Sequence, residues 1–224
     1  MNDYENIKMK KMPAIRRVIS RKMTEAWAVP SFNITTEISM DGFLQYRKSY
    51  GKNLSLTAFI VSDLSRALKK HPKLNGIIQG ESFGMSDAVH MGLALDGPDG
   101  LVVVTLRDAD QKSIEELHEE IRLRMEELEG RRLSMDHITG ATFTLSNLGA
   151  FGVSSCRAVL NPPQVGILGL GGSMKKMVPD SDGRPVVRSY MNGTLTADHR
   201  AVDGADGARF LQCFKQIIEE KEGW

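Results

Sequence analysis

Cysteine and histidine are scarce, which excludes several classes of site. The chain has 224 residues and two cysteines, Cys156 and Cys213, which form no C-x-x-C pair. This count indicates no disulfide framework and fits a reducing compartment such as the cytoplasm. The five histidines are scattered without H-E-x-x-H or another ligand spacing. We therefore expect no metal centre.

Net charge and long apolar runs are also lacking. The formal net charge is +1, so nothing indicates a nucleic acid or an anionic membrane as partner. No apolar run approaches the roughly 20 residues of a membrane span. Residues 1–5 lack the charged-then-apolar order of a signal peptide. Lys8, Lys10 and Lys11 form a small basic cluster that we interpret as a solvated tail. These features predict a cytoplasmic protein.

What the chain does contain is ordinary for a globular domain. Hydrophobic residues make up 41% and charged residues 25% of the sequence. The length suits one large α/β domain or two small ones. There is no internal repeat, low-complexity tract or clear linker. We expect a tail over residues 1–11 and one domain over residues 12–224.

Hydrophobic periodicity predicts a mixture of helices and strands. Helices are expected at residues 13–28, 41–50, 55–70, 112–128 and 205–221, and strands at 31–40, 89–95, 101–106, 141–145 and 186–196. Residues 165–168 are an apolar run that follows a turn at 161–163. Asp41 is expected to cap the second helix. The sequence D-G-P-D-G at 96–100 predicts a hairpin. Because hairpins alternate irregularly with helices, the pattern favours one open mixed β-sheet covered by helices.

Residues 169–173, G-L-G-G-S, have the composition of a phosphate-binding loop but not its pattern. They lack a G-K-[ST] ending and a complete G-x-G-x-x-G, and no helical pattern follows. We interpret these glycines as a bend or a place where another backbone approaches closely.

The most informative stretch is residues 194–211. It begins like a half-buried strand around Leu195 and ends like a helix. His199 lies in the polar turn between them, where α/β proteins often present reactive side chains. Asp203 has two interpretations. It could cap the following helix, or it could be a functional carboxylate that orients His199 or a cationic partner, and the two roles can coexist. The arginines at 16, 17 and 21 could be such partners or simply solvated.

Residues 198–204, D-H-R-A-V-D-G, resemble the D-H-R-x-x-D-G signature of the dihydrolipoamide acyltransferases of 2-oxo acid dehydrogenase complexes. Three other blocks resemble the family in the same order: residues 100–110, residues 143–149 (F-T-L-S-N-L-G) and residues 161–169. The resemblance covers nearly the whole chain from residue 12. It implies the two-layer α/β sandwich of chloramphenicol acetyltransferase, which has a related but different histidine signature.

The resemblance also implies a mechanism, acyl transfer between coenzyme A and dihydrolipoamide. His199 would be the general base toward the attacking thiol, and Ser146 would donate a hydrogen bond to the tetrahedral oxyanion. Without the resemblance, Ser146 is better explained as a turn hydroxyl bonded to its own backbone. Asp203 would hold the site together. Family members form homotrimers with the site between subunits, so His199 and Ser146 are expected to come from different chains.

Several departures from the family pattern bear on these expectations. Ser31 and Ala197 stand where the family often has histidine and tyrosine. Neither change removes a catalytic group. A lipoyl domain and a peripheral subunit-binding domain are not in this sequence, which suggests a catalytic core or a free-standing enzyme. Only Trp224 could act as an apolar docking tail, so we expect an isolated trimer.

The leading hypothesis is thus a dihydrolipoamide acetyltransferase of a pyruvate dehydrogenase complex, working with a lipoyl domain and the other components of the complex. Two alternatives stay open at this point. One is a coenzyme A-dependent acyltransferase acting on another small acceptor, an alcohol or an amine. The other is a non-catalytic scaffold subunit, which would not need His199, Ser146 and Asp203 together.

Overall fold

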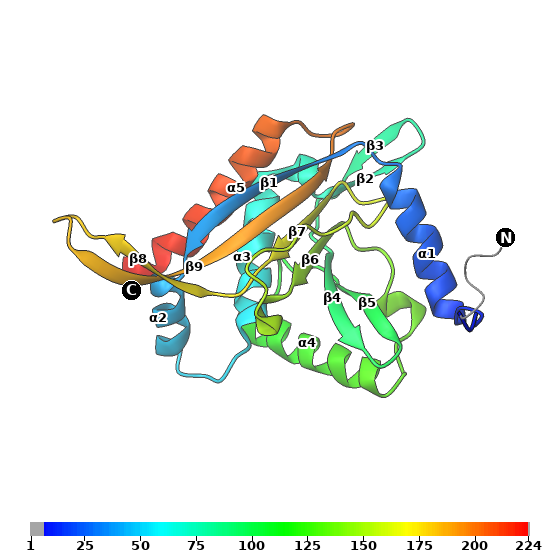
Figure 1. Ribbon diagram of the computed structural model, residues 1–224, viewed down its shortest axis with the longest axis horizontal. Coiled ribbons are helices and arrows are strands. Elements are labelled where there is room, and N and C mark those ends of the chain that lie inside the picture. The colour runs from blue at the N-terminus through cyan, green and yellow to red at the C-terminus, as the bar shows by residue number, and fades with distance from the viewer. Residues whose placement is uncertain (1–6, 224) are drawn as a thin grey trace.

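The computed structural model describes residues 7–223 and contains a mixed β-sheet with helices packed on one face (Figure 1). The expected tail therefore lies only partly within the described residues, and Trp224 lies outside them. The α-helices are α1 (Ala14–Trp27), α2 (Asp41–Ser49), α3 (Leu56–Lys70), α4 (Ile114–Glu129) and α5 (Gly204–Glu219). The strands are β1 (Ser31–Ser39), β2 (Gly76–Gln79), β3 (Ser82–Met85), β4 (Met91–Gly97), β5 (Gly100–Leu106), β6 (Phe143–Asn147), β7 (Gly166–Leu170), β8 (Met174–Pro179) and β9 (Pro185–Asp198).

The main sheet has seven strands in the order β1-β9-β7-β6-β4-β5, with β8 pairing the outer half of β9. The β4–β6 and β6–β7 pairs are parallel and the others are antiparallel. The mixed-sheet prediction is confirmed. Helices α3, α4 and α5 bury their apolar sides against the sheet, with Phe59, Phe210 and Phe214 among the fully buried side chains. Local signals fix two of these helices, because Ser55 caps α3 and Ser113 forms a capping box on α4.

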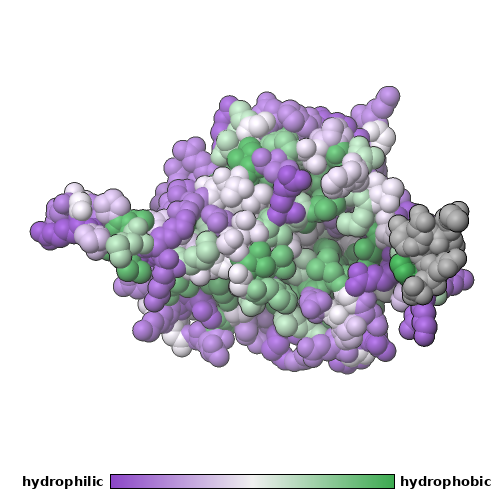
Figure 2. All heavy atoms as spheres, in the orientation of Figure 1, coloured by the Kyte–Doolittle hydropathy of each residue, from purple (hydrophilic) through white to green (hydrophobic). Residues whose placement is uncertain are grey.

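The other face of the sheet is crossed by an extended segment, residues 152–165, which closes over β7 and β9. A Cβ on Gly169 would lie 2.3 Å from the Cys156 carbonyl oxygen, and one on Gly171 would lie 2.3 Å from that of Ser154. The close-approach interpretation of these glycines is therefore confirmed. This segment also buries Thr194 and Thr196, so β9 is buried on both faces where a half-buried strand was expected. Figure 2 shows hydrophobic surface in the middle of this face, with hydrophilic residues around it.

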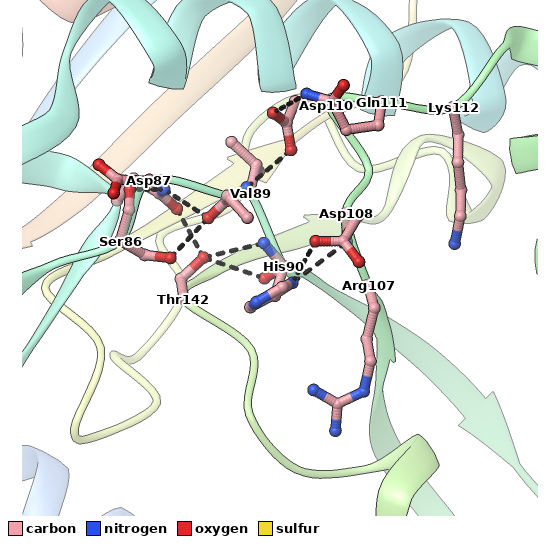
Figure 3. Close-up of polar contacts among 12 residues, drawn as sticks. Ser86, Asp87, Val89, His90, Arg107, Asp108, Asp110, Gln111, Lys112 and Thr142 are labelled. Atoms are coloured by element: carbon pink, nitrogen blue, oxygen red, sulfur yellow. Dashed lines mark hydrogen bonds and ion pairs between the residues drawn. The ribbon is translucent and has the colours of Figure 1, made fainter.

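The family-like block at residues 100–110 ends in polar side chains that fasten strand ends together (Figure 3). Asp110 accepts a hydrogen bond from the Val89 backbone N–H at 2.8 Å. The Nδ1 atom of His90 accepts one from the Asp108 N–H at 3.1 Å, and the Thr142 hydroxyl accepts one from the His90 N–H at 3.1 Å. These bonds join the segments that enter β4, leave β5 and enter β6. The polar residues at the end of this block therefore have a structural role, which is to hold the ends of β4, β5 and β6 in register.

The structure differs from the sequence predictions at three strands and at one helix cap. The β2–β3 hairpin and β8 were not predicted, because β2 and β3 are four residues each and β8 carries two lysines and a terminal proline. Asp41 does not cap α2, which follows Met40 without a side-chain cap. The Asp41 carboxylate instead accepts a hydrogen bond from the Ser189 backbone N–H at 3.0 Å. The Asp41 side chain therefore bonds the backbone of β9 and does not cap its own helix.

Candidate active site

His199 lies in the turn that follows β9, at the end of the sheet where β1 begins. Its backbone N–H donates to the Pro30 carbonyl oxygen at 2.8 Å, and Ser31 pairs with Asp198 across the strands. The imidazole contacts the Phe32 ring edge to face, with the ring centres 4.9 Å apart, and is otherwise exposed. The turn therefore presents the His199 side chain to the surroundings on a fixed backbone.

An ion pair that the sequence analysis missed holds this turn. Asp198 is buried, and its two carboxylate oxygens accept hydrogen bonds from Arg200 Nε at 3.0 Å and Arg200 Nη2 at 2.6 Å. The Arg200 backbone N–H also donates to Asp198 at 3.0 Å. These hydrogen bonds raise the pKa of the Arg200 guanidinium. His199 stands between the two partners, so the pair fixes the direction of its backbone. The D-x-R spacing at the end of a buried strand is the signal that could have revealed it.

Asp203 is the N-cap of α5, as one of its two interpretations predicted. Its Oδ1 atom accepts a hydrogen bond from the Asp206 backbone N–H at 2.9 Å. This bond is the main cause of the lowered pKa of the Asp203 carboxyl. Within the described part of the chain, no ion pair joins Asp203 to the arginines at 16, 17 or 21. Asp203 thus fixes where the turn that carries His199 ends and α5 begins.

Replacing Asp203 by alanine is expected to lower the thermal midpoint at neutral pH by roughly 2–4 °C, the usual effect of a lost cap in a chain of this size. Because folding lowers the pKa of Asp203, its stabilisation is complete above the usual aspartate pKa and is lost as the pH falls through the folded value. Asparagine also caps helices but does not titrate, so Asp203→Asn should melt like the original chain at neutral pH and should keep its cap in acid, where the original chain loses this stabilisation. Melting curves at neutral and acid pH test this; a deficit in Asp203→Ala that persists in acid would contradict it.

Ser146 lies on β6 in the wall of a pocket of about 550 Å³. Most of the lining is apolar and includes Leu95, Leu101, Leu128 and Phe151. Ser146 is only 8% exposed, yet its hydroxyl has no hydrogen-bond partner among the described residues. The turn interpretation, in which this hydroxyl bonds its own backbone, is therefore wrong. The hydroxyl is free to donate to a ligand in the pocket.

Ser146 and His199 do not meet within one chain. Ser146 is level with Gly169 on β7, and Gly169 is level with Thr194 on β9. His199 is five residues farther along than Thr194 and two strands away from β6. The separation is therefore roughly 16 Å along the strands and about 10 Å across them. A site that uses both side chains must bring them from two chains.

Residues 7–223 contain neither a cluster of metal ligands nor a membrane-spanning helix. That range holds no group of three or more histidine, cysteine, aspartate or glutamate side chains placed to hold a metal ion. It also holds no helix long and apolar enough to cross a membrane.

Curated relatives resemble the chain over most of its length. It is 34% identical over 214 residues to a Rickettsia bellii protein, the dihydrolipoyllysine-residue acetyltransferase component of pyruvate dehydrogenase complex, covering 92% of this chain and 51% of that protein. It is 36% identical over 216 residues to the corresponding component of the acetoin cleaving system of Bacillus subtilis, covering 92% and 54%. The chain thus spans about half the length of these relatives.

Solved structures agree with the fold described above. One match is a structure of Azotobacter vinelandii dihydrolipoamide acetyltransferase. It belongs to an investigation of the roles of a serine, a histidine and an asparagine in the catalytic mechanism of that enzyme. Its TM-score is 0.90 at 25% identity, covering 98% of this chain and 95% of that one. The asparagine is the fourth residue after the histidine, as Asp203 is after His199. A chloramphenicol acetyltransferase matches with a TM-score of 0.56 at 16% identity, covering 95% and 99%, which confirms the fold prediction.

The family assignment follows from a match that extends over almost the whole chain, residues 2–224. The chain belongs to the 2-oxoacid dehydrogenases acyltransferase (catalytic domain) family.

Proposed function

We propose that this chain transfers an acyl group between coenzyme A and dihydrolipoamide, and that the group is acetyl. The observation that carries the proposal is the unpartnered Ser146 hydroxyl in an apolar pocket, in a chain that also presents His199 on a braced turn. The family supports acyl transfer, and the names of the relatives support acetyl and a pyruvate or acetoin complex. The Azotobacter study, which concerns a serine and a histidine, supports these two residues as the chemical groups.

The proposed reaction needs one base and one oxyanion donor. A thiol with a pKa of about 8.5 is mostly protonated at neutral pH, so the His199 imidazole takes its proton as the sulfur attacks the thioester carbonyl carbon. The C–S bond forms and the carbonyl oxygen becomes an oxyanion. The Ser146 hydroxyl donates a hydrogen bond to that oxygen. The intermediate then collapses, the original C–S bond breaks, and the departing sulfur takes the proton back from His199.

The site is proposed to form between subunits of a homotrimer. The separation of Ser146 from His199 within one chain supports this. Asp203 and the Asp198–Arg200 pair would act as positioning residues, holding the turn so that His199 points at the neighbouring Ser146.

The direct experiment is an assay of the purified chain with dihydrolipoamide as acceptor and acetyl, branched-chain or succinyl coenzyme A as donors. The proposal predicts transfer with acetyl-coenzyme A as the fastest donor. A lipoyl domain supplied in trans should be acetylated too, since the relatives are components of larger complexes. If no donor supports transfer to dihydrolipoamide, the proposal is wrong. Activity on a small alcohol or amine would then favour an acyltransferase with another acceptor. No activity at all would favour a non-catalytic scaffold subunit.

Replacing Ser146 by alanine should lower kcat by roughly 100- to 1,000-fold, the usual effect of removing one oxyanion donor. The Km for acetyl-coenzyme A should change little, because the hydrogen bond forms mainly in the transition state. Ser154→Ala is a matched control, since Ser154 is an exposed serine on the neighbouring segment and lies outside this pocket. Equal rates for the two variants would remove Ser146 from the mechanism.

A further inference from the structure

Several methionine side chains are exposed, and one of them lies at the site proposed above. Among the described residues, the exposed methionines are Met9, Met12, Met23, Met85, Met125, Met135 and Met177. Met125 is 46% exposed and lines the pocket of about 550 Å³ that has Ser146 in its wall. None of the other exposed methionines lines this pocket. Met125 is therefore set apart by its position and not by its exposure.

The position of Met125 follows from the course of α4. Met125, Leu128 and Glu129 are three and four residues apart, so they share one face of the helix, and all three line the pocket. Ser146 on β6 and Phe151 in the turn after it form another part of the lining. The helix therefore holds the Met125 thioether in the same apolar space that the Ser146 hydroxyl enters.

An accessible thioether is readily oxidised by peroxides. The methionine sulfur attacks one oxygen of hydrogen peroxide, the S–O bond forms, and the O–O bond breaks. The proton of the attacked oxygen passes to the departing oxygen, which leaves as water. The sulfur loses two electrons and the peroxide gains them. The product is methionine sulfoxide, which methionine sulfoxide reductases convert back to methionine.

A sulfoxide at Met125 would change the character of this pocket. Its oxygen is a polar hydrogen-bond acceptor in a lining that is mostly apolar. The charged residues in the lining are the carboxylates Asp96 and Glu129, and an ionised carboxylate has no hydrogen to donate. The Ser146 hydroxyl can donate, but a hydrogen bond to the sulfoxide takes that donor from the oxyanion. Whether the sulfoxide is unpaired or pairs with Ser146, acyl transfer becomes slower.

We propose that Met125 is an oxidation site at which peroxide reversibly lowers acyl transfer. This inference rests on the proposed function, because it takes the pocket beside Ser146 as part of the site of acyl transfer. The two cysteines are the other sulfur groups that peroxide attacks, and both are half-buried. Burial raises the pKa of the Cys156 thiol, which lowers its reactive thiolate fraction. Sulfoxide reductases repair methionine and not oxidised cysteine, so recovery separates the two.

The test treats the intact protein with hydrogen peroxide, removes the peroxide with catalase, and then measures kcat/Km with acetyl-coenzyme A and dihydrolipoamide. Catalase must act first because dihydrolipoamide is itself a dithiol. Each protein is compared with its own untreated sample. The original chain should lose activity by roughly 10-fold or more, the scale set by leaving one polar group unpaired in an apolar site. Reductases for both sulfoxide epimers should restore it.

Two leucine variants identify the residue responsible. Met125→Leu conserves side-chain volume and should lose less than about twofold on treatment. Met177→Leu is the matched control, because it removes a methionine that is 73% exposed on β8, outside the pocket. It should lose as much activity as the original chain. Peptide mass mapping of each treated sample measures the oxidation of Met125 directly, and the oligomeric state should not change.

Three results would overturn this inference while leaving the proposed function in place. They are an equal loss of activity in Met125→Leu, full activity in a chain whose Met125 is oxidised, and inactivation that accompanies a change of oligomeric state. Resistance of Met125 to oxidation, when the other exposed methionines are oxidised, would also overturn it. An untreated chain without any transfer activity would instead overturn the proposed function, and the inference with it.

Discussion

Replacing His199 by alanine is expected to lower kcat for acyl transfer by about 100- to 10,000-fold, the range that a general base contributes. The physical reason is that the attacking thiol loses the group that takes its proton at neutral pH. The backbone N–H of residue 199 still donates to Pro30, and the Asp198–Arg200 pair does not involve the imidazole. The fold and the assembly should therefore survive the change, and the measurement is kcat with acetyl-coenzyme A and dihydrolipoamide.

A matched histidine variant separates chemistry from stability. His118 lies on α4 and accepts a hydrogen bond from the Ser55 backbone N–H through Nδ1. His118→Gln keeps an acceptor near that position and should retain nearly full activity. A His199→Ala protein that keeps more than about a tenth of the original kcat, with its oligomeric state unchanged, would rule out His199 as the base.

Replacing Lys221 by methionine is expected to cost about 3 kcal/mol of unfolding free energy, because it strands a buried carboxylate. Lys221 donates to Asp63 Oδ2 at 2.6 Å, and the side chains are 11% and 3% exposed. The ammonium also lies 4.9 Å from the Phe43 ring centre and 4.7 Å from that of Tyr46. This contact fastens the end of the chain to α3 and α2. Urea unfolding at fixed protein concentration measures the loss.

The stability loss caused by Lys221→Met should also depend on pH, which gives a second test of the Asp63–Lys221 pair. Burial raises the pKa of Asp63 in the folded chain, although Lys221 and Arg66 oppose the shift. Removing Lys221 raises that pKa further, so the folded state takes up a proton more readily as the pH falls. The deficit of Lys221→Met should therefore shrink toward acid pH. The double variant Asp63→Leu/Lys221→Met should recover most of the loss, and a deficit that stays unchanged in the double variant would contradict this account.

Much of the fold could be predicted from local signals. The hairpin joined by D-G-P-D-G, the capped helices α3 and α4, and the cap at Asp203 depend on neighbouring residues and match the structure. Features set by distant segments could not be predicted. Asp41 bonds a residue more than 140 positions away, and the burial of Thr194 depends on a segment that crosses the sheet.

In the candidate site, too, features that depend on local sequence could be predicted, and features that depend on packing could not. The D-H-R-A-V-D-G signature located His199 and Asp203, and periodicity placed both between a strand and a helix. The Asp198–Arg200 pair was missed, because the burial of Asp198 follows from sheet packing. The free hydroxyl of Ser146 and the pocket beside it are also products of packing. The pocket is lined by three separate segments, within residues 94–101, 125–129 and 146–153, which share no local pattern.

The central claim is that Ser146 of one chain and His199 of another form one site. Co-expression of differently tagged His199→Ala and Ser146→Ala chains, followed by purification of the mixed trimers, tests it most directly. Each mixed trimer has one interface with both side chains intact, so its rate should return to about one third of that of the original protein. Mixed trimers no more active than either parent would show that no intact site forms between chains, and would contradict the claim.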